Sequence, residues 1–596
     1  MLHKNVTIVK SQVERLLLPA VRQPARYIGG EMNQICKELE TCDVRIGLCF
    51  PDIYEIGMSH TGLALIYEIL NRQDRISAER FFAPWLDAEE IMRKENIPLF
   101  SLESKATAVS FDFLGFSLTN ELCYTNLLNM LDLTQLEVRA DKRTENDPII
   151  VVGGQASNCA EPIAPFVDLF LLGQGEEACI ELGNLYRTCK QEGKSKEAFL
   201  YAAAKTLPFV YVPRFYEFDS SAGLKTKHKD LPVRFENAVV RNFENAPVPD
   251  APILPWVQAV HDRISIEIMR GCPGRCRFCQ ASFCRRPIRY RSVDRIFDIA
   301  VKQYENTGHD TISLLSLSTG EYPWLEELID KLTAHFAPRH VGLSVPSLRV
   351  DQQLKILPKL VSSVRKSGLT LAVEAATERL RAVINKPISD EDLFAAVKAA
   401  YEAGFQKVKL YFMVGHPGET MDDVRRITDL SYEIARIRKS VDGKLATVNA
   451  AVSWFVPKPH TPFGWFGQKP KAYFTEARKV LIDRKFELGA RCVQIKFHRI
   501  ERSVLESAMG RGDRRIADVI ETAWRNGARF DLWDETFDAD CWQQAFENHG
   551  MNLDTEAQRS YQPGQKLPWA HLGGPKEESL LKHYQDADRR VSEDIQ

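Results

Sequence analysis

The sequence predicts an α/β protein in three parts: a doubly wound parallel domain, a partial parallel barrel and a small, mostly helical C-terminal region. Two observations predict this class. Buried-strand patterns alternate with helical patterns in both larger regions, and such alternation gives parallel sheets. Glycine and small polar residues gather just after the predicted strands, where such sheets bind ligands. The predicted boundaries are 1–205 for the first domain, 206–260 for a linker, 261–470 for the barrel and 471–596 for the last region.

Composition and charge place the chain among ordinary globular proteins. Hydrophobic residues make up 44% and charged residues 27% of the sequence, which is typical of water-exposed folded domains. The net charge of -2 lacks the positive excess that is typical of nucleic-acid-binding proteins. No apolar run reaches the ~20 residues of a membrane span, and residues 1–10 lack a signal-peptide core. Thirteen cysteines at irregular spacings indicate a reducing compartment. We therefore expect a cytoplasmic protein with no membrane partner, and no nucleic-acid partner is indicated.

The first domain shows four strand patterns and a clear helical face. Apolar residues at Leu63, Ile66, Tyr67 and Leu70 recur with helical spacing. The strands are predicted at 44–50, 109–117, 149–152 and 167–172. At or beyond their carboxyl ends stand small or polar residues that would let a flat ligand approach the backbone; the ones selected are Ser117, Gly153, Gly154, Gly175 and Glu176. The alternative is that the glycines only make strand-to-helix turns. This Rossmann-like pattern leaves both interpretations open.

The second region has six strand patterns, which is three quarters of a (β/α)8 barrel. They are predicted at 264–268, 311–315, 341–345, 369–373, 407–414 and 447–455. A proline-rich stretch before them, with four prolines between 247 and 255, predicts an extended connector. A partial (β/α)6 TIM-type barrel is therefore expected, with its chemistry at the carboxyl ends of the strands.

Three cysteines follow the first of these strands in one tight loop. Cys272, Cys276 and Cys279 are separated by three and then two residues. Zinc normally takes four ligands from paired Cys-x2-Cys knuckles, and the sequence has no second knuckle. Clustered cysteines are the usual ligands of an iron–sulfur cubane, and three of them would leave one iron open. The alternative is a chance group of thiols, and Cys284 is interpreted as a packed thiol rather than a ligand.

The Cys-x3-Cys-x2-Cys spacing, with Phe278 just before the last cysteine, resembles the signature of the radical S-adenosylmethionine (SAM) superfamily. The resemblance implies a [4Fe-4S] cluster on the three cysteines, SAM on the open iron, and reductive cleavage of SAM to a 5'-deoxyadenosyl radical. It also implies an unidentified substrate and a reductant such as flavodoxin or ferredoxin. The implied SAM contacts are Phe278, Ser318, Thr319, Gly320, Arg349, Glu374 and Gly415. His416 is left open between a substrate-facing residue and an ordinary loop histidine.

The first domain, placed before this motif, resembles the cobalamin-binding domain common in the superfamily. The resemblance implies that the five strand-end residues named above contact a corrinoid. The sequence departs from the pattern because it has no Asp-x-His-x-x-Gly, and His60 has the wrong spacing. Cobalamin would then bind without a protein histidine ligand, or the domain is corrinoid-free. The segments 50–59 and 82–87 resemble those of an uncharacterised subgroup of such proteins.

These features predict a radical SAM enzyme in which methylation of an unactivated carbon, assisted by cobalamin, is the leading outcome. A rearrangement or ring contraction would use the same parts. A methylthiotransferase is a weaker alternative, because Cys36, Cys42 and Cys49 are spaced too irregularly for a second cluster. A non-catalytic iron–sulfur protein for electron transfer or sensing is the alternative from another class. The catalytic side chains are not identified, and the tail from Glu577 is predicted to be charged and frayed.

Overall fold

The computed structural model describes residues 4–219, 223–345 and 369–593, and the chain divides into two compact units. Unit 1 comprises Met1–Asp262, Met509–Leu553 and Gly564–Gly574, and unit 2 comprises Arg263–Ala508, Asp554–Pro563 and Pro575–Gln596. Residues 206–260, predicted as a linker, lie in unit 1. Residues 471–596, predicted as one C-terminal region, are shared between the units. Within the described ranges, none of the helices is long and apolar enough to cross a membrane.

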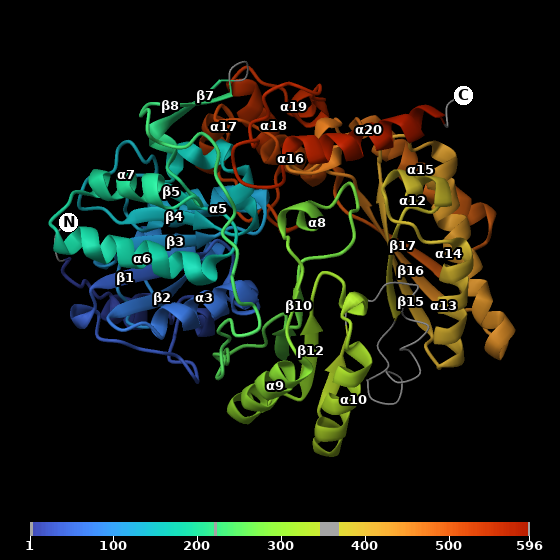
Figure 1. Cartoon of the computed structure of the whole chain (residues 1–596), viewed down its shortest axis with the longest axis horizontal. Helices are drawn as coiled ribbons and strands as arrows, with labels where there is room; N and C mark the ends of the chain where they lie inside the picture. Colours follow the sequence, from blue (N-terminus) through green and yellow to red (C-terminus); the bar gives the residue numbers. More distant parts are fainter. Residues whose placement is uncertain (1–3, 220–222, 346–368, 594–596) are drawn as a thin grey trace. The chain divides into compact units, whose positions relative to one another are not determined.

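Unit 1 is built on a six-stranded sheet in the order β2-β1-β3-β4-β5-β6 (Figure 1). The first five strands are parallel and β6 is antiparallel to β5. The strand order reverses between β1 and β3, which is where doubly wound sheets usually hold a ligand. The strands are β1 (Val44–Phe50), β2 (Ile76–Phe82), β3 (Phe113–Ser117), β4 (Ile149–Gly153), β5 (Leu169–Leu171) and β6 (Val210–Tyr211). The parallel α/β character predicted for this region is confirmed.

The principal helices of unit 1 connect these strands. They are α3 (Thr61–Asn71), α4 (Leu86–Lys94), α5 (Tyr124–Leu133), α6 (Gly175–Gln191) and α7 (Lys196–Thr206). A hairpin of β7 (Tyr216–Asp219) and β8 (Gly223–Thr226) follows within the stretch predicted as a linker. Two later helices, α17 (Ile516–Arg525) and α18 (Ala539–Asn548), also belong to this unit.

Strand β2 was not predicted, because its sequence places three polar residues among apolar ones. All seven of its residues are buried, among them the charged Arg80. The guanidinium pairs with Glu31 at 3.0 Å and with Glu103 at 2.6 Å, and the side chains of all three residues are almost fully buried. A buried charge is tolerated when it is paired and hydrogen-bonded. The partners come from distant parts of the sequence, so no local pattern marks the strand.

Unit 2 contains two parallel sheets, in the orders β13-β12-β9 and β14-β15-β16-β17. The strands are β9 (Ile264–Glu267), β12 (Thr311–Leu315), β13 (Gly342–Ser344), β14 (Leu369–Glu374), β15 (Lys407–Val414), β16 (Thr447–Trp454) and β17 (Val493–Phe497). The six predicted strands are therefore confirmed, and β17 extends the second sheet. No pairing joins the two sheets among the described residues, so the structure shows two parallel sheets and not a closed barrel.

Helices cover the sheets of unit 2 in the alternation that the sequence predicted (Figure 1). They are α9 (Val293–Thr307), α10 (Leu325–Phe336), α12 (Glu378–Val383), α13 (Asp390–Glu402), α14 (Met421–Asp442), α15 (Lys471–Glu487) and α16 (Ile500–Gly510), whose last two residues fall in unit 1. Apolar residues of α13, α14 and α15 share one core with strands β14 to β17. A capping box between Thr420 and Asp423 fixes the start of α14 directly after the β15 turn.

The predicted frayed tail is wrong for residues 577–593, which form helix α20 (Glu577–Glu593). Ala587 is fully buried in an apolar cluster with residues from β14 to the loop after β16. Asp586, its neighbour, forms an ion pair with Arg277 of the cysteine loop. The charged composition misled because the contacts that hold the helix, those of Ala587 and of Asp586, are made with residues far away in the sequence.

Candidate metal centre

The three cysteines lie in a loop whose base is closed by two short strands. Strands β10 (Met269–Arg270) and β11 (Arg289–Tyr290) pair antiparallel, so residues 271–288 leave and return at one place. Gly271 opens the loop with φ +93°, and a methyl group there would lie 2.8 Å from the carbonyl oxygen of Arg285. Only glycine fits such a position without displacing the backbone.

The side chain of Arg286 holds the first turn of the loop through hydrogen bonds to backbone carbonyls. The Nη2 atom of Arg286 donates to the carbonyl oxygens of Cys272, Pro273 and Gly274, at 3.1, 3.3 and 3.2 Å. Three consecutive carbonyls held by one guanidinium leave this turn little freedom. The positive charge also lies beside the place where thiolates would gather.

The second half of the loop is fixed to the segment after α12. Arg277 donates from its backbone nitrogen to Ile384 O at 2.9 Å and from its side chain to Ala382 O at 3.0 Å. The same guanidinium reaches Asp586 of α20, and Asn385 donates to Arg275 O at 2.8 Å. The cysteine loop is therefore anchored at several points to the end of α12, to the residues just after it and to α20.

All three predicted ligand cysteines are half-buried. A methyl group at Gly274 would lie 3.4 Å from Cys272 Sγ and 3.9 Å from Cys276 Sγ, so these two sulfurs share one side of the turn. Burial raises the pKa of the Cys276 thiol to about 11, against the opposing effect of Lys386. A coordinated metal has the opposite influence, because it deprotonates the thiols that bind it.

The donor set fits an iron–sulfur cluster better than a single ion. Within residues 4–219, 223–345 and 369–593, no three His, Cys, Asp or Glu side chains are arranged to hold a metal ion. A cubane is held by cysteine thiolates through separate irons, so its ligands stand further apart than those of one ion. Cys284, at the end of α8 (Gln280–Cys284), has its pKa raised to about 12 by burial, as expected for a packed thiol.

Glu374, a predicted SAM contact, stands at the carboxyl end of β14 in an unusual conformation. Its φ is +67°, and the pairing of β14 with β15 shifts register between Ala372 and Glu374. Non-glycine residues rarely adopt such angles, and those that do gather at functional sites. Its carboxylate accepts from Lys386 Nζ at 3.0 Å. Both side chains act on the pKa of Cys276, in opposite directions, which places them close to the cysteine loop.

The SAM contacts predicted after β12 are buried, and one of them forms a hydrogen bond within its own turn. Ser318 precedes the 3-10 turn Thr319–Glu321, in which Thr319 and Gly320 are also buried. The hydroxyl of Thr319 pairs with that of Ser316 at 2.9 Å, so it has a structural partner. Arg349, the remaining predicted contact from this side, lies outside the described residues.

Gly415 follows β15, and its backbone requires glycine. Its φ is +107°, and a methyl group would come within 2.6 Å of the Phe474 ring. Its N–H donates to Glu419 Oε1 at 2.6 Å, and the same oxygen accepts from Tyr473 at 2.7 Å. Burial raises the pKa of Glu419 to about 8 despite these bonds.

His416, directly after Gly415, is fully buried. Its ring lies 6.0 Å from Phe278 of the cysteine loop, 5.2 Å from Phe455 and 6.4 Å from Phe463, measured between centroids. Neither ring nitrogen has a hydrogen-bond partner in the part of the chain that the structure describes. Burial lowers its pKa to about 3, so the imidazole is neutral.

The glycines predicted to open unit 1 to a corrinoid meet the chain's own atoms. A methyl group at Gly154 would lie 2.4 Å from Leu118 O, and one at Gly175 would lie 2.9 Å from Ile66 Cδ1. Glu176 is buried at the start of α6, and Ser117 and Gly153 pair in register at the ends of β3 and β4. The close packing of the chain explains Gly154 and Gly175 without a ligand.

The topological switch point of unit 1 is also covered by its own chain. Asp52, just beyond β1, accepts from Trp533 Nε1 at 3.0 Å, and Asn126 of α5 accepts from the backbone of Phe530 at 2.8 Å. Residues 530–533 thus bind where a ligand would be expected. The corrinoid contacts predicted for Ser117, Gly153, Gly154, Gly175 and Glu176 stay a prediction.

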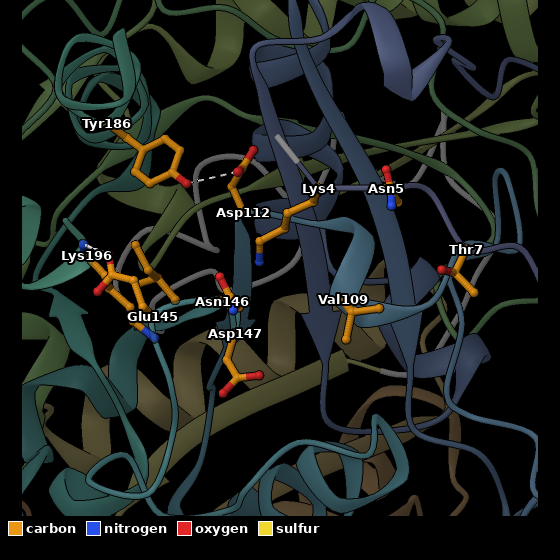
Figure 2. A pocket seen from close by; sticks show the side chains of 11 residues that line it. Lys4, Asn5, Thr7, Val109, Asp112, Glu145, Asn146, Asp147, Tyr186 and Lys196 are labelled. Atoms are coloured by element: carbon orange, nitrogen blue, oxygen red, sulfur yellow. Dashed lines mark hydrogen bonds between the residues drawn. The ribbon is translucent and has the colours of Figure 1, made fainter. Parts of the chain in front are cut away.

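A cavity of about 340 Å³ lies at the opposite, amino end of the same sheet (Figure 2). Its charged groups are bonded to the surrounding chain. Tyr186 donates to Asp112 at 2.9 Å, Lys4 donates to Phe111 O at 2.7 Å, and Lys196 donates to Pro148 O at 3.3 Å. The cavity wall is therefore a paired polar network, which we interpret as structural.

Two family models match this chain, and one of them covers the cysteine loop. Residues 62–213 match the N-terminal domain of radical SAM proteins, and residues 266–431 match the radical SAM superfamily. The chain therefore carries a radical SAM domain preceded by the N-terminal domain of radical SAM proteins. Proteins of this superfamily use a [4Fe-4S] cluster and SAM.

Several individual proteins are similar to this chain. The uncharacterised protein MJ0966 of Methanocaldococcus jannaschii is 26% identical over 438 residues, which are 72% of this chain and 84% of that protein. The ribosomal protein uS12 methylthiotransferase RimO of Pelotomaculum thermopropionicum is 27% identical over 179 residues. That match covers 28% of this chain and 39% of RimO.

Two solved structures resemble the chain in part. The cobalamin-dependent SAM radical enzyme OxsB has a TM-score of 0.49 at 14% identity, covering 93% of this chain and 80% of its own. The radical SAM methyltransferase TsrM of Kitasatospora setae has a TM-score of 0.45 at 14% identity, covering 71% and 74%.

Sequence reasoning missed several residues of the site. Lys386, Glu419 and the Arg277–Asp586 pair were not selected, and His416 was not assigned a role. Glu419 had one available signal, a carboxylate four residues after a strand-end glycine. The other contacts join residues that are not neighbours in the sequence, so local spacing could not reveal them.

Proposed function

We propose that this protein is a radical SAM enzyme whose [4Fe-4S] cluster is held by Cys272, Cys276 and Cys279. The observation that carries the proposal is the cysteine loop itself: three thiols on one turn, closed at its base by β10 and β11 and braced by Arg286. The match of residues 266–431 to the radical SAM superfamily supports it.

When bound, the cluster and SAM would supply reductive cleavage to a 5'-deoxyadenosyl radical, which removes hydrogen from an unactivated carbon. The residues of this chain would bind and orient SAM and would keep water away from the radical. Glu374, held by Lys386, would accept hydrogen bonds from the ribose hydroxyls of SAM. Phe278, Phe455 and Phe463 form an apolar wall beside the loop, and such walls keep water from reactive species.

The test is production of 5'-deoxyadenosine by anaerobically reconstituted protein supplied with dithionite and SAM. We expect Cys276→Ala to abolish it and to lower the iron content. Cys284→Ala is the matched control, because this thiol lies in the same loop and is packed rather than coordinating; it should keep both properties. If wild type with a full cluster made no 5'-deoxyadenosine, and SAM left the cluster's paramagnetic resonance spectrum unchanged, the proposal would fail.

For the step after SAM cleavage we propose methylation or another modification of an unactivated carbon, on an unidentified substrate and with an external reductant such as flavodoxin or ferredoxin. Whether cobalamin takes part is decided by a binding measurement. The measurement is the absorption spectrum of protein purified with hydroxocobalamin and desalted. Tightly retained cobalamin would make methyl transfer the leading reaction, and its absence would favour a modification that uses the radical alone.

A methylthiotransferase is the second candidate, favoured by the partial similarity to RimO. It needs a second cluster, so about eight irons per chain against about four for a single cubane. Cys36 is exposed, Cys42 bonds the carbonyl of Glu38, and Cys49 is buried in β1. These three thiols stand on separate segments, so we expect about four irons in the reconstituted protein.

A further inference from the structure

The second sheet of unit 2 has one apolar face and one polar face. On strands β14 to β17, every second residue is buried, most of them in the core shared with α13, α14 and α15 (Figure 1). The residues between them point to the other face, because successive side chains of a strand alternate. On β15 these include Lys407, Lys409 and Tyr411, which are all exposed. The four strands are parallel, and such sheets are normally covered on both faces, so the polar face calls for an explanation.

The strand register brings polar side chains of three strands together on this face. Lys409 is in register with Asn449 of β16. Tyr411 is in register with Ala451 of β16, which in turn pairs with Lys496 of β17. Residues in register on parallel strands point to the same face. We call this surface the basic face; it consists of Lys407, Lys409, Tyr411, Asn449 and Lys496.

The positive charges of the basic face are not matched by carboxylates. Among the residues that the structure describes, none of its three lysines forms an ion pair. Glu374, at the end of β14, is paired with Lys386. A surface that serves only solubility mixes charges of both signs. An excess of one sign over a sheet face instead attracts ligands of the opposite charge.

Two polar groups of the basic face are oriented or left over for a ligand. Lys409 Nζ donates to the phenol oxygen of Tyr411 at 2.7 Å, so the phenol hydrogen can be donated to a further acceptor. Asn449 Oδ1 is buried and has no hydrogen-bond partner within the described ranges. Buried polar atoms are almost always bonded, and each exception calls for an explanation. A ligand that offers both an anion and a hydrogen-bond donor would satisfy both groups.

The basic face continues to the edge of the sheet where SAM is proposed to bind. Glu374 ends β14 and is in register with Phe412 of β15. Lys409 precedes Phe412 by three residues, which is roughly 10 Å along a strand. A molecule whose anionic group is held at Lys409 could therefore extend along the strand and present a carbon at the carboxyl edge.

We propose that the basic face binds the anionic group of the substrate, so that the substrate is a molecule carrying a carboxylate or a phosphate. This inference rests on the proposed function and names its substrate class. Lys409 and Lys496 neutralise the anion, Tyr411 donates to it, and Asn449 accepts from a hydroxyl or amino group beside it. The carbon that reacts lies roughly 10 Å from the anion, the distance from Lys409 to the level of Glu374.

The experiment measures binding of two probes, inorganic pyrophosphate and succinate, to the full-length, cofactor-free protein by titration calorimetry at constant ionic strength. We expect at least one probe to bind with a millimolar or lower dissociation constant. Lys409→Met and Lys496→Met should each weaken that binding roughly tenfold, because each removes a charged donor. Tyr411→Phe should weaken it less. A preference for pyrophosphate indicates a phosphate-bearing substrate, and a preference for succinate indicates a carboxylate.

Lys479→Met is the matched control, because Lys479 is an exposed lysine of α15, one of the helices that pack on the apolar face of the sheet. It removes the same charge and should leave probe binding unchanged. Without probe, Lys409→Met and Lys496→Met should unfold at the temperature of wild type, because neither lysine has an ion pair to lose. Thermal unfolding checks this.

Three results would overturn the inference. The first is that wild type binds neither probe. The second is that Lys409→Met and Lys496→Met bind as tightly as wild type. The third is that Lys479→Met loses as much affinity as they do, which would show a diffuse charge effect. If Lys409→Met did not fold, unchanged affinity in Lys409→Gln would count against the inference in the same way. No probe measurement involves the cluster or SAM, so a negative result here leaves the 5'-deoxyadenosine test of the proposed function standing.

Discussion

Glycines in the loops that follow strands of the two units are surrounded by different atoms. In unit 1, the space beside Gly154 is occupied by the backbone of Leu118. In unit 2, the atoms nearest to Gly274 are the sulfurs of Cys272 and Cys276. The first glycine lets the chain pack on itself, and the second lets two potential ligands stand over the turn. Glycine alone therefore does not predict a cofactor; the chemistry of the neighbouring atoms does.

The largest expected effect concerns the brace of the cysteine loop. Arg286→Leu removes the donor shared by three loop carbonyls, so the thiols should no longer be held in one arrangement. We expect the reconstituted variant to retain less than half of the roughly four irons of wild type, measured by iron and sulfide analysis. Arg285→Leu, at the exposed neighbouring position, is the control. Full iron in both variants would show that the loop needs no brace.

The next prediction compares a glycine packed against backbone atoms, Gly154, with one that faces open space, Gly193. Gly154→Ala should destabilise the protein by more than about 2 kcal/mol, because it adds a backbone clash to an unfavourable positive φ. Gly193→Ala has a positive φ in open space and should cost roughly 1 to 2 kcal/mol. Denaturant unfolding of both variants measures the difference. Equal costs would mean that the turn at Gly154 relaxes easily and is free to admit a ligand.

The smallest effect is a change in pH dependence at the β15 turn. The pKa of Glu419 is raised to about 8 from an ordinary value of 4.5, so the folded protein keeps a proton that the unfolded chain loses. Its contribution to stability is fully present below about pH 4.5 and is lost as the pH rises through about 8. Glu419→Gln keeps the oxygen that accepts from Gly415 and Tyr473.

The Glu419→Gln variant should therefore gain unfolding temperature over wild type as the pH rises from about 5 to about 8, with no further gain above. Thermal unfolding at several pH values measures this. A difference that does not change with pH would mean that Glu419 ionises in the folded protein near its ordinary pKa.

Much of the fold could be predicted because it is encoded locally. The strands at 311–315 and 407–414 begin and end where the apolar pattern does. Strand β2 was missed because the charge of its Arg80 is matched by Glu31 and Glu103. Helix α20 was missed because Ala587 is buried by distant residues.

The residues of the candidate site also divide into those that the local sequence reveals and those that depend on the fold. The three cysteines are local in sequence and form one motif, so they could be selected. The ion pair of Glu374 with Lys386 and the aromatic environment of His416 depend on how separate strands end beside one another. Arg349 lies outside the described residues, and its predicted role stays a prediction.

Helix α20 has a consequence for the order in which the protein is made. Asp586 follows Arg277 by 309 residues, so at about 5 to 20 residues per second the ribosome adds this partner roughly 15 to 60 s after the cysteine loop has been synthesised. During that interval the loop lacks one of its anchors. Delivery of iron and sulfide before translation is complete would meet an unfinished binding loop. Maturation of the cluster should therefore wait for the end of the chain.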